Sequence, residues 1–458
     1  MQANDFEELI AAQRACFQSG VTLPIPARLA ALKRLSEEFS KREDLFLAAL
    51  KEDLGKSPFE SYAAEVAMVR EELHAALRHT KEWAKPRRAA VSLAQFPASA
   101  RQYPQPLGVS LIVSPWNYPL LLSLAPVISA VSAGCCFLLR PSSQAPRTAA
   151  ALQELIAAAF PARQGAALLC SREETDLLLS CRFDHIFFTG SAAVGKRVMA
   201  AAARHLTPVT LELGGKSPCI VEESADLAKT ARRIIWGKFL NAGQTCVAPD
   251  YLLVQRSVKQ QLLGRLTAAL LAAYGPEPMA NPELPHIISP DHTRRLMALT
   301  QGEKIVVGGK ANPEARRMEP TILDDITWES PVMAQEIFGP ILPVLTFDTP
   351  EEAFAAVAAR EHPLAAYLFT KNRAVQQKFC RELLFGGGCI NDTVAHLASS
   401  SLPFGGVGGS GMGRYHGRAG FDAFSHQKSV LKKSFALPEV MLRYAPFGDH
   451  LSLLKKLF

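Results

Sequence analysis

The sequence predicts an α/β protein with a parallel, doubly wound sheet and a second α/β domain. Between about residues 107 and 213, short apolar runs alternate with Ala-rich helical segments, which is typical of a parallel sheet with helices on both faces. The alternation returns between 214 and about 391. A chain of 458 residues is long enough for two or three domains.

The expected elements follow one another along the chain. From Asn4 to about Lys85 the apolar spacing is helical, and Gly55 is the expected end of a long helix. Pro86 interrupts this pattern, and a polar connection over about 89–107 follows. The first sheet is expected to use 108–114, 135–140, 166–170, 185–190 and 208–213, and the apolar segments of the second domain are 234–240, 250–255, 266–275, 303–310 and 364–370. A Gly-rich loop, SLPFGGVGGSGMG, and a short basic tail come last.

Composition excludes several classes of protein. With 48% hydrophobic and 20% charged residues, the chain is neither disordered nor fibrous. The net charge of +7 is spread along the chain, which indicates mild attraction for anionic cofactors and no nucleic-acid partner. The nine cysteines show no metal-binding or disulfide spacing, so no metal and a cytoplasmic location are expected.

Two terminal segments bear on membranes and secretion. The N-terminal residues lack a secretory signal, and no apolar stretch reaches membrane-spanning length. The C-terminal DHLSLLKKLF could lie on a membrane surface, although docking against its own protein is the favoured interpretation.

Three side chains are candidates for catalysis. Cys246 follows small and polar residues in FLNAGQTCVAPDY, where a thiol can be reached by substrate; the alternative is a small buried hydrophobe. Glu212 is a single carboxyl in the apolar strand PVTLEL, where desolvation would raise its pKa and suit a general base, unless it faces solvent. Asn117 follows a strand and could donate to an oxyanion, or could simply form a turn.

Two Gly-rich segments resemble phosphate-binding motifs, but only one of them has the strand, turn and helix that such a motif requires. FDHIFFTGSAAVGK is a strand, turn and helix in order, so backbone N–H groups could meet a phosphate. Gly190, Gly195 and Lys196 match a nucleotide-hydrolysing P-loop, but Arg197 stands where Ser or Thr would hold magnesium, so dinucleotide binding is favoured. The run GGVGGSG follows no strand and is expected to form a tight loop near the substrate cleft.

Six blocks occur in a fixed order: PWNYP, FTGSAAVGK, LELGGKSP, GQTCVAPDY, EIFGP and SLPFGGVGGSGMGRYHG. Together they resemble the aldehyde dehydrogenase superfamily, most of all its class 3 branch of fatty and aromatic aldehyde dehydrogenases, over nearly the whole chain. The resemblance implies a Rossmann-like cofactor domain (1–84 and 102–213), a catalytic domain (214–391), an oligomerisation arm (85–101 and 426–445) and a Gly-rich active-site loop region (392–425). It also implies a homodimer.

The resemblance further implies oxidation of an aldehyde to a carboxylic acid with NAD or NADP. Cys246 would be the nucleophile that forms a thiohemiacetal and then a thioester, Glu212 the general base for hydrolysis, and Asn117 the oxyanion donor together with the backbone N–H of Cys246. The implied cofactor contacts are Pro115, Trp116, Arg140, Ser142, Ser143, Gly190, Ser191, Gly195, Leu213, Glu336 and Phe338. An apolar substrate pocket would use Tyr118, Leu122, Thr245 and Phe404, with Phe424, and would favour medium-chain aliphatic or aromatic aldehydes.

One block departs from the family pattern and bears on the cofactor. The family usually has Lys-Pro-Ser-Glu after its second strand, whereas this chain has Arg140, Pro141, Ser142 and Ser143. A guanidinium without a neighbouring acid would accept a 2′-phosphate, so we expect NADP to be used.

Three other interpretations stay open at this stage. Arg414 is a candidate clamp for a negatively charged semialdehyde. Transfer of the acyl group to coenzyme A is an alternative to hydrolysis, against which Glu212 argues. A catalytically retired scaffold is a third possibility, against which the intact Cys246, Glu212 and Asn117 argue.

Overall fold

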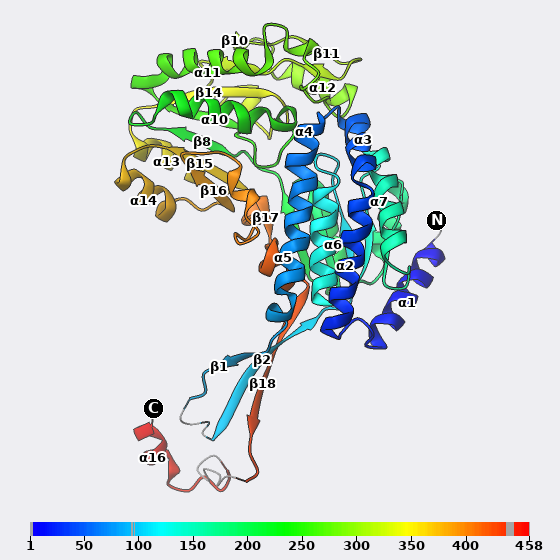
Figure 1. Cartoon of the computed structure of the whole chain (residues 1–458). Helices are drawn as coiled ribbons and strands as arrows, with labels where there is room; N and C mark the ends of the chain where they lie inside the picture. The colour runs from blue at the N-terminus through cyan, green and yellow to red at the C-terminus, as the bar shows by residue number, and fades with distance from the viewer. Residues whose placement is uncertain (1–2, 93–94, 96, 437–443, 458) are drawn as a thin grey trace.

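The computed structural model describes residues 3–92, 95, 97–436 and 444–457. Two α/β units, each built on its own sheet, make up most of this part of the chain, and a slender arm projects from the first unit (Figure 1). The expected α/β fold class is therefore confirmed.

The first sheet has the doubly wound topology that positions a ligand crevice. Its strands lie in the order β17-β7-β6-β3-β4-β5, with bounds Gly411–Met412 (β17), Val209–Leu213 (β7), His185–Gly190 (β6), Val109–Val113 (β3), Cys136–Arg140 (β4) and Gly165–Ala167 (β5). Neighbours are parallel except β17, which is antiparallel to β7. The chain passes from β3 outward to β5 and then returns to the other side of β3, so the strand order reverses between β3 and β6. Ligands of such sheets bind at the carboxyl ends beside this reversal.

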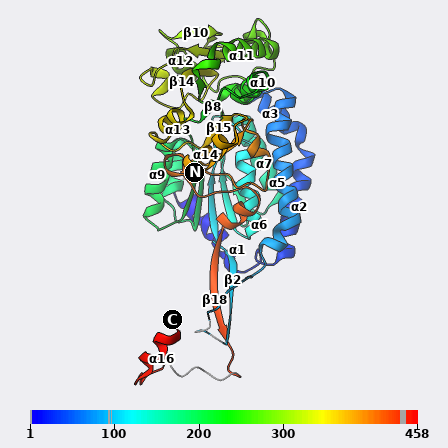
Figure 2. The same cartoon turned by 90° about the vertical axis from the view of Figure 1, so that its left-hand side faces the viewer.

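Helices cover both faces of the first sheet (Figure 2). Side chains alternate along each strand, so Leu111 and Leu138 pack on the face of α1 and α9, whereas Ile112 and Leu139 pack on the face of α2, α6 and α7. The helices of this unit are α1 (Ala3–Gln18), α2 (Ile25–Lys41), α3 (Glu43–Leu54), α4 (Pro58–Ser61), α5 (Ala67–Trp83), α6 (Leu121–Ala133), α7 (Pro146–Ala159), α8 (Arg172–Ser180), α9 (Ala192–Ala203) and α15 (Gly417–Ala423), with a π-helical segment η1 (Tyr62–Val66).

The long N-terminal helix expected from the sequence is two helices. The expectation of one continuous helix was wrong because Arg42, with φ −110° and ψ 14°, leaves the helical region between α2 and α3. Gly55 does end the second of them, with a left-handed φ of 66° that a residue with a side chain rarely adopts.

The second sheet has seven strands in the order β10-β13-β14-β9-β8-β15-β16. The strands are β8 (Pro218–Val221), β9 (Tyr251–Gln255), β10 (Lys304–Val307), β13 (Thr321–Asp324), β14 (Ile341–Phe347), β15 (Ala365–Phe369) and β16 (Gly387–Ile390), and the helices are α10 (Leu227–Phe239), α11 (Lys259–Tyr274), α12 (Pro290–Ala298), α13 (Pro350–Ala358) and α14 (Arg373–Glu382). Only β10, at the edge, is antiparallel to its neighbour. The apolar segment 234–240 lies in α10 and the turn after it.

The arm is a three-stranded antiparallel sheet of β1 (Arg87–Ala89), β2 (Ala98–Pro106) and β18 (Ser425–Lys433). The polar connection expected over 89–107 was therefore wrong. Strand β2 was missed because its residues, apart from the buried Pro106, are exposed or half-buried and show no apolar alternation. The first segment of the arm continues past residue 101 to Pro106, and its second segment begins at Ser425, one residue earlier than expected. Residues 437–443 of the expected arm lie outside the described part of the chain.

The C-terminal segment forms the short helix α16 (His450–Leu457). Its Leu451 and Leu454 remain 64% and 41% exposed, so the expected docking against its own chain was wrong. Among the described helices, none combines the length and the apolarity needed to cross a membrane.

Candidate active site

Polar side chains and two cavities lie at the carboxyl ends of the strands in the first sheet. The loop after β3 carries Asn117, the turn after β6 carries Ser191, and β7 ends with Glu212 and Leu213. The nucleophile candidate Cys246 comes from the second unit, on the loop between α10 and β9. The site is therefore formed where the two units meet.

The cavity on the side of the first sheet has a volume of about 240 Å³. Its walls include Gly190 and Ser191, in the turn between β6 and α9, and two aromatic rings, Trp116 and Phe338, whose centroids lie 5.4 Å apart. The lining residues are Pro115, Trp116, Asn117, Leu122, Thr189, Gly190, Ser191, Glu212, Leu213, Gly214, Cys246, His292, Glu336, Phe338, Leu364 and Phe404. We call this the cofactor-side cavity.

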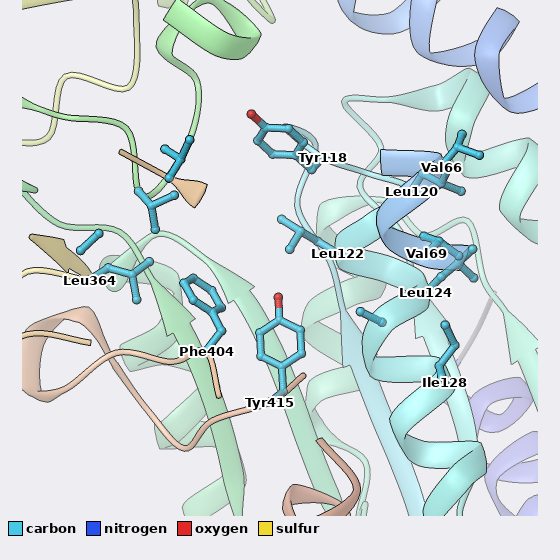
Figure 3. Packing of buried hydrophobic residues seen from close by; sticks show 14 of the residues in the cluster. Val66, Val69, Tyr118, Leu120, Leu122, Leu124, Ile128, Leu364, Phe404 and Tyr415 are labelled. Carbon is cyan, nitrogen blue, oxygen red and sulfur yellow. The ribbon is translucent and has the colours of Figure 1, made fainter. Parts of the chain in front are cut away.

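A second cavity of about 500 Å³ is mostly apolar, and we call it the substrate-side cavity. Tyr118, Leu122, Phe404 and Tyr415 turn toward a common space from the loop before α6, from α6 and from the C-terminal loop (Figure 3). The expected Thr245 also lines it. Leu122, Cys246 and Phe404 lie on both cavities, so the thiol stands where the two spaces join.

The loop that carries Cys246 has an unusual backbone. Asn241, Ala242 and Gly243 all have left-handed φ values, of 53°, 51° and 74°. A Cβ at Gly243 would lie 2.2 Å from the carbonyl oxygen of Gly339, so only glycine fits there. The Gln244 side chain holds the loop by donating to the Asn241 and His286 carbonyl oxygens and accepting from the Ile288 N–H. Strain of this kind persists only when the surroundings enforce it, and it clusters at functional sites.

Glu212 is a buried carboxyl with no hydrogen-bond partner among the described residues. It lies in β7 opposite Thr189 of β6 and Gly411 of β17. The Gly-rich loop can approach this closely because Gly411, with φ 143°, has no Cβ to strike the Leu211 carbonyl oxygen. Burial raises the pKa of Glu212 well above its ordinary value. A carboxyl left unpaired in a cavity is costly to keep, which makes it a candidate for proton transfer.

The Cys246 thiol is partly exposed in the junction of the two cavities. Burial raises its pKa, and the nearby carboxyl groups of Glu336 and then Glu212 raise the pKa further, because they disfavour a second negative charge. The thiol is therefore protonated at neutral pH, and a base is needed to remove its proton.

The loop 336–338 is fixed by two side chains of α12. His292 Nε2 donates to the Phe338 carbonyl oxygen at 2.8 Å, while Arg295 donates to the carbonyl oxygens of Ile337 and Glu336. Burial lowers the pKa of His292 to about 4, so its ring is neutral and one nitrogen carries the donated proton. Burial also raises the pKa of Glu336 to about 8.

Some expected site residues lie away from both cavities. Gly195 packs its Cα against Leu213, and Phe424 is fully buried against His185 and Phe187 in the core. The expectation that Phe424 lines the substrate pocket was therefore wrong, because α15 and β18 fold it beneath the sheet. Arg414 is exposed and does not line the substrate-side cavity.

The altered block after β4 also stands apart from the cofactor-side cavity. Arg140 ends β4 and donates from Nη2 to the Cys170 carbonyl oxygen at 3.1 Å, while its Nε has no hydrogen-bond partner among the described residues. Ser142 is buried and Ser143 is exposed beside it. A guanidinium with spare donors is thus available near the carboxyl end of β4.

Several lining residues were not predicted from the sequence. Glu60, Trp236 and His416 line the substrate-side cavity, and His292 lines the cofactor-side cavity. The YHG of the last sequence block was a signal for His416, whereas Glu60 and Trp236 sit in ordinary helical patterns. Within the described residues, no three His, Cys, Asp or Glu side chains gather as a metal site.

Comparison with known proteins identifies the family to which this chain belongs. The profile described as "Aldehyde dehydrogenase family" matches residues 1–430. Aldehyde dehydrogenase family 3 member H1 of Arabidopsis thaliana is 43% identical over 455 residues, covering 98% of this chain and 94% of that protein. The 4,4'-diaponeurosporen-aldehyde dehydrogenase of Staphylococcus aureus is 42% identical over 457 residues, covering 99% of each.

Solved structures agree in fold. The substrate-bound state of Staphylococcus aureus AldH superposes with a TM-score of 0.96 at 41% identity, covering 99% of both chains. The Mycobacterium tuberculosis aldehyde dehydrogenase complexed with NAD+ gives a TM-score of 0.85 at 29% identity, covering 95% of this chain and 92% of that one.

Proposed function

This chain belongs to the aldehyde dehydrogenase family and oxidises aldehydes with a nicotinamide dinucleotide; on that premise, we propose that Cys246 is the nucleophile. The observation that carries the proposal is the unpaired, buried carboxyl of Glu212 in the same cavity as the thiol. Because a thiolate attacks and a thiol does not, the Cys246 proton has to be removed first. The Glu212 carboxyl lines the same cavity as the thiol and has no hydrogen-bond partner among the described residues, so it is free to accept that proton.

Asn117 is the donor for the oxyanion that forms when the Cys246 sulfur adds to the aldehyde carbon. A primary amide has two N–H donors, and one of them donates to the Gln244 carbonyl oxygen at 3.0 Å. That contact orients the amide and leaves the second N–H for the substrate oxygen in the cofactor-side cavity. Preorganised donors of this kind stabilise the developing charge of a thiohemiacetal.

The cofactor-side cavity fits a nicotinamide dinucleotide. Gly190 ends β6 and Ser191 is the N-cap of α9, and both line the cavity, so the backbone N–H groups at the start of this helix lie where they suit a pyrophosphate. Trp116, Glu336 and Phe338 would flank the nicotinamide and its ribose. When bound, the cofactor supplies the hydride acceptor that turns the thiohemiacetal into a thioester. Arg140, without an acidic neighbour, would pair with a 2′-phosphate, so NADP is accepted as well as NAD.

Hydrolysis completes the reaction. After Glu212 has released the thiol proton to solvent, a water molecule loses a proton to the Glu212 carboxylate and its oxygen bonds to the acyl carbon. The carbon–sulfur bond then breaks, and the departing Cys246 thiolate takes the proton back from Glu212. The products are a carboxylic acid and the free enzyme. Burial raises the pKa of Glu212, and a carboxylate with a raised pKa is a stronger base toward the thiol and toward water.

The substrate class is neutral aldehydes of medium chain length or with an aromatic ring. The substrate-side cavity holds about 500 Å³, is mostly apolar, and includes the carboxyl groups of Glu60 and Glu283 but no Lys or Arg among its lining residues. A negatively charged semialdehyde would meet repulsion there instead of a cationic clamp.

The protein is proposed to act as a homodimer in the cytoplasm. Val430 and Leu431 of the arm are 40% and 47% exposed, although they lie in a paired strand, so a partner subunit can cover them. A free thiol nucleophile also requires a reducing compartment.

The test is the rate of cofactor reduction with benzaldehyde, hexanal and succinate semialdehyde, each with NAD and with NADP. Cys246→Ala is expected to abolish turnover while leaving cofactor binding intact. Turnover by the Cys246→Ala protein would overturn the proposal, whereas turnover of the wild-type enzyme only after addition of coenzyme A would replace hydrolysis with acyl transfer.

A further inference from the structure

A fully buried ion pair lies beneath the loop that carries Asn117. Lys56, just after α3, and Glu65, in the π-helical segment η1, have no exposed side-chain surface, and Lys56 Nζ donates to Glu65 Oε1 at 2.7 Å. Neither residue lines the substrate-side or the cofactor-side cavity. The pair is therefore placed next to the site without contacting its contents.

Both members of the pair bind the backbone of the same five residues, 117–121. Lys56 Nζ also donates to the Asn117 carbonyl oxygen at 3.0 Å and lies 4.1 Å from the centre of the Tyr118 ring. Glu65 Oε2 accepts the backbone N–H groups of Leu120 and Leu121, at 2.9 and 3.2 Å. These are donors at the start of α6, which has no side-chain cap of its own.

The same carbonyl oxygen connects this loop to the nucleophile loop. Asn241 Nδ2 donates to the Asn117 carbonyl oxygen at 2.7 Å and to the Gln244 carbonyl oxygen at 3.2 Å. Gln244 in turn accepts from the Asn117 amide. Lys56 and Asn241 thus occupy both lone pairs of one carbonyl, which leaves the main chain of Asn117 no alternative orientation.

Stability alone is a weak reason for such a pair. Removing two charges from water offsets much of their mutual attraction, and a well-packed apolar pair of similar volume would serve a core equally well. Directional hydrogen bonds to a single loop do what apolar packing cannot, since they specify the orientation of that loop.

Resting on the proposed role of Asn117, we propose that Lys56 and Glu65 are positioning residues, which hold the 117–121 loop so that the Asn117 amide points at the reacting carbonyl oxygen. They act on the rate at which the oxyanion forms and not on the binding of the cofactor. A misplacement on the order of 1 Å at such a group lowers a rate by about 100-fold.

The experiment combines Lys56→Met with Glu65→Gln, which we call the paired variant. Methionine fills the space of the lysine, and the glutamine oxygen still accepts the N–H groups of Leu120 and Leu121, so no charge is left buried alone. The readouts are the rate of cofactor reduction in the first turnover with benzaldehyde and the dissociation constant of NAD+. We expect a roughly 10- to 100-fold slower first turnover with an unchanged dissociation constant.

A double-mutant cycle with Asn117→Ala separates positioning from general damage. Asn117→Ala alone should slow the first turnover by about 100- to 1000-fold. Adding the paired variant to Asn117→Ala should cause little further loss, because the amide that it positions is gone. Multiplied losses, or a paired variant with a normal first turnover, would overturn the inference alone. A normal first turnover in Asn117→Ala would instead overturn the proposed oxyanion role and the inference with it.

Two further variants serve as a control and as an alternative test. Asp53→Asn changes another buried carboxylate, which accepts from Arg147 and Thr148 away from both cavities, and it should leave the first turnover unchanged. If the paired variant fails to fold, Lys56→Arg keeps the charge beside Glu65 but shifts its donors relative to the Asn117 carbonyl oxygen. It should slow the first turnover with NAD+ binding intact, and a normal rate would overturn the inference.

Discussion

The carboxyl of Glu60 accepts a 2.7 Å hydrogen bond from the backbone N–H of Asn241, five residues before Cys246. This single contact connects the wall of the substrate-side cavity to the strained loop that carries Cys246, the proposed nucleophile. It also places a carboxyl group inside a cavity that is otherwise mostly apolar, which has consequences both for substrate choice and for stability.

Glu60→Gln should relax discrimination by substrate charge. Burial raises the pKa of Glu60 to about 7, so above that pH the carboxylate repels a carboxylate on the substrate. At an effective dielectric constant of about 20, this repulsion corresponds to roughly 10- to 100-fold in kcat/KM. We expect the variant to raise kcat/KM for 4-carboxybenzaldehyde by that factor and to leave 4-methylbenzaldehyde nearly unchanged. Glu154→Gln, on the exposed face of α7, is the control, and equal changes for both substrates would contradict the prediction.

The contribution of Glu60 and Glu336 to the free energy of unfolding should fall as pH rises from about 4.5 to about 8. Burial raises the pKa of Glu60 from 4.5 to about 7 and that of Glu336 to about 8, so these two carboxyls hold more protons in the folded protein than in the unfolded chain across this range. Stability contributed by such groups is present below the ordinary pKa and is lost through the raised pKa. Urea titrations at several pH values measure the slope, and Glu60→Gln should flatten it by about 3 kcal/mol in total. A slope that is the same in the variant would show that Glu60 does not titrate as described.

Glu212→Gln should test whether Glu212 serves both halves of the reaction. The amide can take a proton neither from the Cys246 thiol nor from water, so the steady-state rate should fall by about 100- to 10,000-fold. If another group removes the thiol proton in the absence of Glu212, one equivalent of reduced cofactor will form in a burst while the thioester accumulates on Cys246. Intact-mass spectrometry detects this adduct. A steady-state rate close to that of the wild type would exclude Glu212 as the base.

Arg140→Gln should weaken the binding of NADP more than the binding of NAD. A charge-assisted hydrogen bond to the 2′-phosphate contributes about 1.5 to 3 kcal/mol, so KM for NADP should rise by roughly 10- to 100-fold. Ser143→Glu, which restores the acid that the family usually carries, should act in the same direction while leaving the guanidinium in place. Initial rates with each cofactor measure both effects. Equal KM changes for NAD and NADP in these variants would contradict the predicted role.

The sequence predicted the three candidate catalytic residues because each differs in character from its immediate neighbours. Asn117, Glu212 and Cys246 each stand beside apolar strands or small residues, and such local contrast can be seen without a structure. The parallel first sheet was predicted for the same reason, since its strands are apolar on both faces.

The remainder depends on tertiary packing. Lys56, Glu60 and Glu65 lie among other polar and charged residues, a pattern typical of a solvated face. Lys56 and Glu65 are buried only because α4 and η1 pack over the loop after β3. Strand β2 was missed because its polar side chains gain their pairing from β18, more than 300 residues away in the chain. Neither the burial of these charged side chains nor the pairing of β2 with β18 can be recognised from the local sequence.

The two cavities share Leu122, Cys246 and Phe404 and otherwise have separate walls. With the aldehyde and the dinucleotide in separate cavities, as proposed above, the acid can leave through the substrate-side cavity while the dinucleotide is still bound. An inhibitor that fills the substrate-side cavity should therefore compete with the aldehyde but not with NAD.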